Sequence, residues 1–106
     1  MANVQLSWTA PTSTTGVEGL VVLRKSDAGS TPVGTDFIAA DQTRSSSTAS
    51  DLQANVTQIG SDITDLTVVE ASETGLGSGS YWYAVFPYNA AGYGPAEITD
   101  SVLTIS

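Results

Sequence analysis

Short segments of strand-like sequence, each closed by turn-forming residues, constrain the fold of this chain more than any other feature. Residues 4–9 alternate apolar and polar side chains with a period of two, which is typical of a strand with one face in water. Residues 19–25 and 81–89 are two further strands, richer in apolar and aromatic side chains, and residues 98–105 form a last one. Because no long helical repeat interrupts these strands, the sequence predicts one all-β domain over residues 1–106, a two-sheet antiparallel sandwich.

The middle of the chain, residues 36–72, has the least regular pattern. Residues 37–40 are a candidate short strand, and the Ser-rich residues 44–50 are expected to form a polar loop. Apolar side chains that recur from residue 55 onward indicate one or two more strands. A short amphipathic helix over residues 49–59 is the alternative.

Charge and composition exclude several functions. Eleven acidic and three basic residues leave a formal net charge of −8 on 106 residues. A nucleic acid binds through Lys and Arg that displace its counterions, so we expect no nucleic-acid partner. The chain has no Cys and no His, which removes structural zinc sites, disulfides, thiol nucleophiles and Ser–His or Cys–His catalysis. No apolar run approaches the ~18 residues of a membrane-spanning helix, and the first residues lack a signal-peptide pattern, so we expect synthesis in the cytoplasm and no membrane partner.

The carboxylates are weak candidates for a chemical site. Asp62 with Asp65, or Asp27 with its neighbours, could contribute calcium ligands, but calcium takes about six to eight oxygens, and we expect solvated, turn-forming side chains instead. Glu70 and Glu73 could form an acid–base pair for glycosidic cleavage, but we interpret them as solubilising residues of a loop. The prediction is a non-enzymatic protein with no catalytic residues, no metal and no cofactor.

Three segments, taken in order, resemble a fibronectin type III domain. Residues 4–11, Val-Gln-Leu-Ser-Trp-Thr-Ala-Pro, are similar to the second strand of that family with its core tryptophan and the proline that follows. Residues 19–24, Gly-Leu-Val-Val-Leu-Arg, resemble the family's Gly-Tyr-x-Val-x-x strand, with Leu20 where Tyr is usual. Residues 76–94 resemble its Tyr-x-Val-x-Val-x-Ala-x-Asn strand and closing turn, through Tyr81, Tyr83, Val85, Pro87 and Asn89.

The resemblance implies an immunoglobulin-like sandwich in which Tyr81 is the tyrosine-corner residue, with its hydroxyl bonded to nearby backbone. It also implies that strands 19–25 and 81–89 are neighbours in one sheet. Two features depart from the family: residues 36–72 are longer than its usual middle, and little sequence precedes Val4 to supply a first strand. Members of this family serve mostly as spacers and recognition modules, so the resemblance implies no catalytic residues.

Strand alternation divides the apolar side chains between two faces. The face towards the other sheet is expected to form the core, with Leu6, Trp8, Leu20, Val22, Leu76, Tyr81, Tyr83 and Val85. The opposite face of the 19–25 and 81–89 strands is also apolar, and it carries Val21, Leu23, Trp82, Phe86 and Tyr88. Because an exposed apolar patch of this kind marks an interaction surface, the sequence predicts an interface at these five residues.

Three explanations for the second apolar face are open. Residues 36–72 could fold across it, with Phe37, Ile38, Ile59 and Ile63 as candidate partners. Another protein subunit, either a copy of this chain or a capsid or tail protein, could cover it instead. In the third explanation, Trp82 and Tyr88 stack on a sugar.

We expect a structural or attachment module that works by protein–protein contacts as a small subunit of a larger assembly. Small, acidic, Ser/Thr-rich β-sandwiches resemble accessory proteins of virus particles, such as phage capsid decoration or tail proteins, so a virion or extracellular surface is the expected location. The alternative is a carbohydrate-binding or adhesion module of a bacterial secreted protein, with Trp82, Phe86 or Tyr88 as the stacking platform. The short sequence before Val4 also leaves room for a partner to donate a strand to an open sheet edge.

Overall fold

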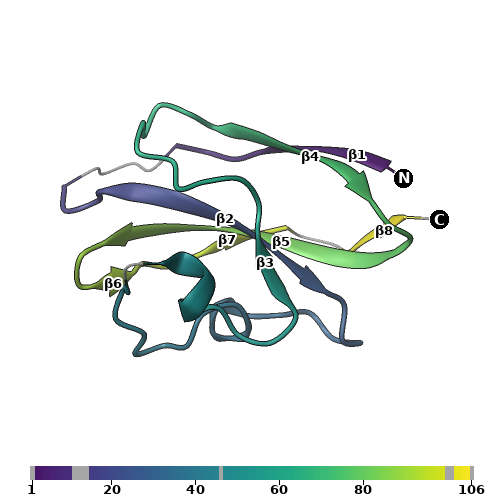
Figure 1. Ribbon diagram of the computed structural model, residues 1–106, viewed down its shortest axis with the longest axis horizontal. Coiled ribbons are helices and arrows are strands. Elements are labelled where there is room, and N and C mark those ends of the chain that lie inside the picture. The colour runs from purple at the N-terminus through teal and green to yellow at the C-terminus, as the bar shows by residue number, and fades with distance from the viewer. Residues whose placement is uncertain (1, 11–14, 46, 100–101, 106) are drawn as a thin grey trace.

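Two antiparallel sheets form the layers of the molecule in the computed structural model, which describes residues 2–10, 15–45, 47–99 and 102–105 (Figure 1). The smaller sheet pairs β1 (Ala2–Ser7) with β4 (Glu70–Leu76). The larger sheet is built on β2 (Gly19–Ser26) and β5 (Gly79–Asn89), flanked by β3 (Val56–Gln58), β6 (Gly92–Tyr93), β7 (Glu97–Ile98) and β8 (Leu103–Ile105). The fold is therefore all-β and antiparallel with sandwich-like layers, as the sequence predicts.

The ladder between β2 and β5 lies at the centre of the larger sheet. It runs from Gly19 opposite Tyr88 to Ser26 opposite Tyr81, without a break in register. This ladder confirms the expected pairing of the two apolar strands. β2 is apolar over consecutive residues because both faces of the ladder are buried, whereas β1 alternates because its outward side chains are exposed.

Buried side chains on the two faces of this ladder form two separate clusters. The inner cluster lies between the two sheets and consists of Val4, Val22, Ile59, Leu76 and Tyr83. Of the core residues expected from the sequence, the structure buries Leu20, Val22, Leu76 and Tyr83. The others are half-buried and pack against the inner cluster: Leu6, Trp8, Tyr81 and Val85.

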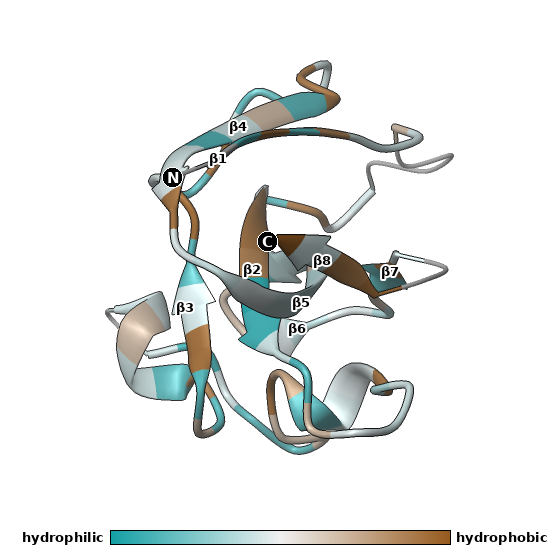
Figure 2. Ribbon diagram, turned by 90° about the vertical axis from the view of Figure 1, so that its right-hand side faces the viewer, coloured by the Kyte–Doolittle hydropathy of each residue, from teal (hydrophilic) through white to brown (hydrophobic). Residues whose placement is uncertain are grey.

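Residues 34–45 and 47–63, here called the covering segment, lie mostly across the face of the larger sheet that points away from β1 and β4 (Figure 2), while their last residues reach the inner cluster. The segment contains the short 3-10 helices η1 (Gly34–Asp36) and η2 (Thr48–Asp51), followed by β3. No strand forms at residues 37–40, where Ile38 makes a single bridge to Leu52. The alternative of a helix over residues 49–59 is wrong, because η2 ends at Asp51 and β3 pairs with β2.

The C-terminal strand expected over residues 98–105 is divided between β7 and β8, and residues 100–101 lie outside the described residues. Both β7 and β8 pair with β5, on the side of it opposite β2. Near the start of β5, the Tyr81 hydroxyl donates a hydrogen bond to the Gly77 carbonyl oxygen at 3.1 Å. The expected bond from this hydroxyl to nearby backbone is therefore present.

We predict that Phe37→Ala lowers the free energy of unfolding by about 3–5 kcal/mol, because Phe37 is fully buried and its loss leaves a cavity under the covering segment. Urea denaturation followed by fluorescence measures this change. The matched control is Val33→Ala, since Val33 is 59 % exposed and its truncation should change stability by less than about 0.5 kcal/mol. Equal effects of the two substitutions would contradict the role given to Phe37.

Candidate functional site

The apolar outer face expected to be an interface is buried. Val21 and Leu23 have no exposed surface, and the most exposed of the five residues, Tyr88, is only 8 % exposed. The prediction of an open interaction surface at Val21, Leu23, Trp82, Phe86 and Tyr88 is therefore corrected. The covering segment occupies this face, which is the first of the three explanations left open by the sequence.

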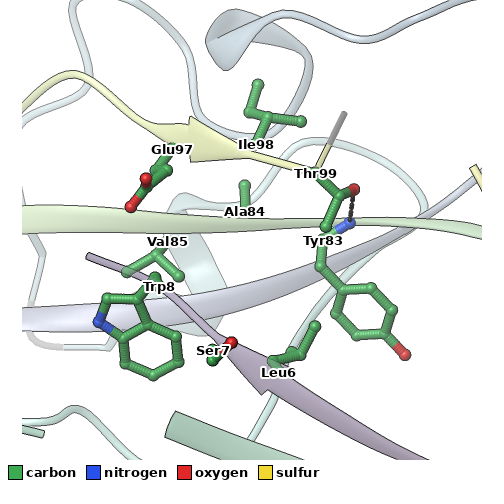
Figure 3. Close-up of a pocket in the computed structure, with 9 residues that line it drawn as sticks. All are labelled: Leu6, Ser7, Trp8, Tyr83, Ala84, Val85, Glu97, Ile98 and Thr99. Carbon is green, nitrogen blue, oxygen red and sulfur yellow. Dashed lines mark hydrogen bonds between the residues drawn. The ribbon is translucent and has the colours of Figure 1, made fainter. Parts of the chain in front are cut away.

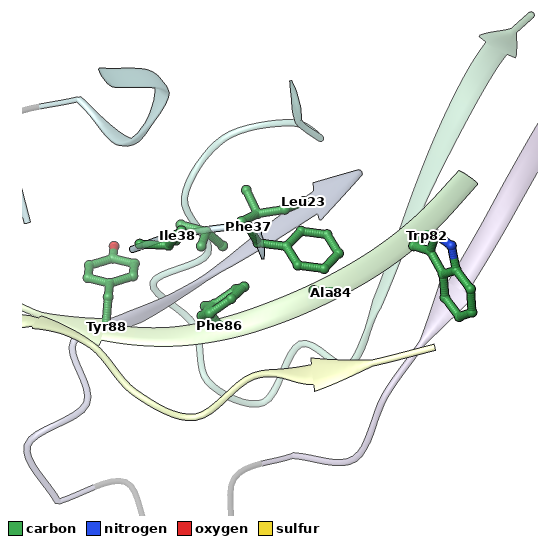
Figure 4. Close-up of a cluster of buried hydrophobic side chains, with 8 residues drawn as sticks. Leu23, Phe37, Ile38, Trp82, Ala84, Phe86 and Tyr88 are labelled. Atoms are coloured by element: carbon green, nitrogen blue, oxygen red, sulfur yellow. The ribbon is translucent and has the colours of Figure 1, made fainter. Parts of the chain in front are cut away.

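Aromatic side chains fill the space between the sheet and the covering segment (Figure 4). The Phe37 ring packs against Phe86 with a centroid distance of 6.1 Å, and Phe86 meets Tyr93 edge to face at 6.3 Å. Ile38 joins this outer cluster. Ile59 and Ile63 do not, because they pack with the inner cluster instead. Half of the expected covering residues therefore belong to the other core.

Arg44 ties the covering segment to the larger sheet. Its guanidinium lies over the Tyr88 ring, 3.7 Å from the ring centroid, and forms an ion pair with Asp62. It also donates hydrogen bonds to the hydroxyls of Thr48 at 2.7 Å and Tyr93 at 3.1 Å. One side chain thus connects three parts of the covering segment to β5 and β6, and the low exposure of Arg44 strengthens these contacts.

Asp51 is the second polar anchor of the covering segment, and it is only 4 % exposed. Its carboxylate accepts hydrogen bonds from the Tyr93 hydroxyl at 2.6 Å and from the Ser45 N–H at 3.1 Å. Burial alone would raise the pKa of Asp51, but these hydrogen bonds outweigh burial and hold the pKa below its usual value. The pKa of Asp62 is lowered in the same way: hydrogen bonds from Gln58 and Arg44 outweigh the effect of burial.

We predict that acid loosens the covering segment. The pKa values of Asp51 and Asp62 are lower in the folded chain than the ~3.9 of an unfolded aspartate, so their stabilisation is fully present above about pH 5 and is lost as the pH falls through the folded values. Urea denaturation between pH 6 and pH 2.5 should show a falling free energy of unfolding. The fall should be shallower in Asp51→Asn, and parallel curves for the two proteins would contradict this account.

The remaining candidate carboxylates do not assemble into a chemical site. Glu73 forms an ion pair with Arg24 and accepts a hydrogen bond from the Tyr83 hydroxyl at 2.8 Å. Burial and the Glu73 carboxylate raise the pKa of Tyr83. Glu70 is exposed on β4. Because it is three residues from Glu73 in the same strand, the two side chains point to opposite faces of the sheet. An acid–base pair is thus not brought together, and the interpretation of both residues as solubilising residues of a loop is wrong, because they lie in strand β4 and Glu73 is held by internal contacts.

Loop aspartates serve as local hydrogen-bond acceptors. Asp65 accepts from the Thr67 hydroxyl at 2.6 Å, and Asp27 accepts from the Trp82 indole N–H at 2.9 Å. Within the described part of the chain, no group of three or more acidic side chains could hold a metal ion.

A cleft of about 250 Å³ opens between the two sheets on the side of β1 (Figure 3). β1 and the residue after it provide one wall, with Leu6, Ser7 and Trp8. The other lining residues come from β5 and β7, namely Tyr83, Ala84, Val85, Glu97, Ile98 and Thr99. The cleft is smaller than the ~300–1,000 Å³ of small-molecule sites, so it has room for one or two side chains.

The β1 strand leaves one of its edges unpaired beside this cleft. Among the described residues, β1 pairs with β4 alone. The Trp8 N–H donates to the Val69 carbonyl oxygen at 3.0 Å, which places the backbone groups of Trp8 and Leu6 towards β4. Because these groups alternate along an antiparallel strand, those of Gln5 and Ser7 point away from β4, towards the open edge. Trp8 also carries a buried indole nitrogen without a hydrogen-bond partner among the described residues.

Two further hollows border β6 and the residues that follow it. Their volumes are about 460 and 470 Å³. Both are lined mainly by Gly, Pro, Ala and aromatic residues, and Tyr88 and Tyr93 are the titratable side chains among their lining residues. The residues that line the two hollows include no carboxylate, so neither hollow provides a pair of carboxylates for acid–base chemistry.

Sequence reasoning did not find the cleft or its residues on β7. The pairing of β1 with β4 alone, among the described residues, is visible only in the structure. Sequence reasoning also treated residues 44–50 as a polar loop and so missed Arg44, and it gave Asp51 no role beyond that of a solvated loop carboxylate. Arg44 is one of only three basic residues in a chain with eleven acidic ones, which could have marked it as an internal partner.

Comparisons with protein-family models, with curated proteins and with solved structures find no match to this chain. In the described residues, no helix has the length and apolar character needed to cross a membrane. The function is therefore argued from the geometry alone.

Proposed function

We propose that this chain is a non-enzymatic attachment module with a fibronectin type III-like fold, held in a larger assembly by contacts between polypeptides. The observation that carries the proposal is the edge of β1 that no other described strand pairs with, beside a partly apolar cleft. An unpaired strand edge presents a row of free N–H and C=O groups, and these are the groups that a second polypeptide can pair with.

Three features support the fibronectin type III-like fold. β1 includes residues 4–7, the first part of the segment that resembles the family's second strand, and it packs in the sheet opposite β2 and β5. β2 and β5 are neighbours in one sheet, which the resemblance implies. The Tyr81 hydroxyl bonds to the backbone four residues upstream, the geometry of a tyrosine corner.

The carbohydrate-binding alternative loses its platform. Trp82, Phe86 and Tyr88, the side chains that would stack on a sugar, are at most 8 % exposed. Arg44 already covers the Tyr88 ring, so a sugar could reach that ring only after the covering segment had moved. The geometry therefore favours a polypeptide partner at the β1 edge.

The proposal predicts that the purified chain is a monomer, whereas the chain in its native source belongs to a larger complex. Purified, it should be a monomer of 10.9 kDa by light scattering; in an extract of its native source, antibody detection after gel filtration should find it in a much larger complex. A native chain that elutes at the monomer mass would contradict the proposal. Saccharide-dependent quenching of tryptophan fluorescence in the purified chain would favour the alternative instead.

A further inference from the structure

We propose that the cleft beside β1 accepts a single extended strand from a different polypeptide, with apolar residues at alternate positions and basic residues at its ends. This inference rests on the proposed function and specifies how the partner binds. It is carried by the backbone of the β1 edge, by the width of the larger sheet beneath it, and by the charge of the cleft.

The backbone of β1 sets the binding mode. Gln5 and Ser7 direct their N–H and C=O groups away from β4, so an added strand can form hydrogen bonds with both residues. The side chains of Leu6 and Trp8 point from β1 towards the larger sheet, where they are only half-buried. An added strand would place alternate side chains on the same inner face, in the cleft next to these residues.

The larger sheet limits which partners can reach this edge. Glu73 of β4 pairs with Arg24 of β2 and accepts a hydrogen bond from Tyr83 of β5, so β4 lies over the ladder of these two strands. Leu6 and Trp8 of β1 line the cleft with residues of β5 and β7, so β1 lies nearer to β7 than β4 does. β7 extends beyond β1, and the smaller sheet has no strand over it in the described residues. One extended strand needs only the space beside β1 and above β7, whereas a second folded sandwich would also bring a second layer of sheet towards β7.

Charge sets the composition of the strand. Glu97 pairs in register with Val85, so its carboxylate lies on the face of β7 that borders the cleft, as Figure 3 shows. The lining residues include no Lys or Arg. Of the three basic residues in the chain, Arg24 and Arg44 are already in internal ion pairs. A second copy with a net charge of −8 offers little to this site, while a basic segment of another protein complements it.

The test uses synthetic peptides of the series Lys-Thr-Φ-Thr-Φ-Thr-Lys, in which Φ is Val, Ile, Leu or Phe, added to the full chain; alternation then places both Φ and both Lys on the face towards the cleft. At least one peptide should bind one-to-one with a dissociation constant below about 1 mM. At saturation, hydrogen exchange of the Gln5 and Ser7 amides should slow by about tenfold or more. The Leu6 amide, which faces β4, should not change. In Trp82→Phe, the emission of the remaining tryptophan, Trp8, should shift on binding.

Two matched controls distinguish backbone pairing with β1 from nonspecific hydrophobic binding. The same peptide with its β1-facing amides N-methylated keeps its side chains but loses its hydrogen-bond donors, and it should bind at least about tenfold more weakly. Ser7→Pro removes an N–H from the β1 edge and should weaken binding, whereas Ser72→Pro removes one from the outer edge of β4 and should not. If Ser7→Pro does not fold, the N-methylated peptide decides the question.

Several results would overturn the inference. The inference is wrong if no peptide of the series binds at 1 mM, or if N-methylation leaves binding unchanged. It is also wrong if the two proline variants lose binding equally. Equal binding of a peptide with Glu in place of both Lys would overturn its charge component. A purified dimer that Ser7→Pro dissociates would assign the edge to a second copy instead. If no peptide binds while the native chain still elutes in a large complex, the strand mode fails and the attachment function stands.

Discussion

The ladder between β2 and β5 supports both cores of this protein, and the other elements depend on its position. Its inner face carries Val22 and Tyr83 against the smaller sheet, while its outer face carries Val21 and Phe86 against the covering segment. A strand buried on both faces must be apolar at consecutive positions, which explains why β2 does not alternate. Burial of both faces also forces the chain to supply two different covers, one a sheet and the other an irregular segment.

Sequence pattern predicted the two central strands and their alternation because this information is local. The direction in which Val21 and Val22 point follows from a period of two, and the structure places them in different clusters accordingly. The cover over the outer face could not be predicted in the same way. Its main contacts come from Phe37, which lies in no regular element, and from Arg44, whose partners are distant in the sequence.

The cleft beside β1 was harder to predict, because it results from a difference in width between two sheets. No single residue encodes that difference: Glu97 and Thr99 look like exposed residues of an ordinary edge strand, and only their position beyond β1 turns them towards a cleft. The half-buried state of Trp8 has the same origin. A core tryptophan in the sequence signals a buried side chain, but how completely it is buried depends on the strands around it.

The net negative charge of the chain opposes aggregation when the covering segment opens. Whenever this segment detaches, the large aromatic side chains of β5 become exposed together, and such a surface promotes aggregation. A net charge of −8 repels other copies over about 10 Å at moderate ionic strength, the range over which two exposed faces would first meet. The acidic residues in excess of the basic ones therefore act as a kinetic safeguard against aggregation, one that high salt or low pH removes.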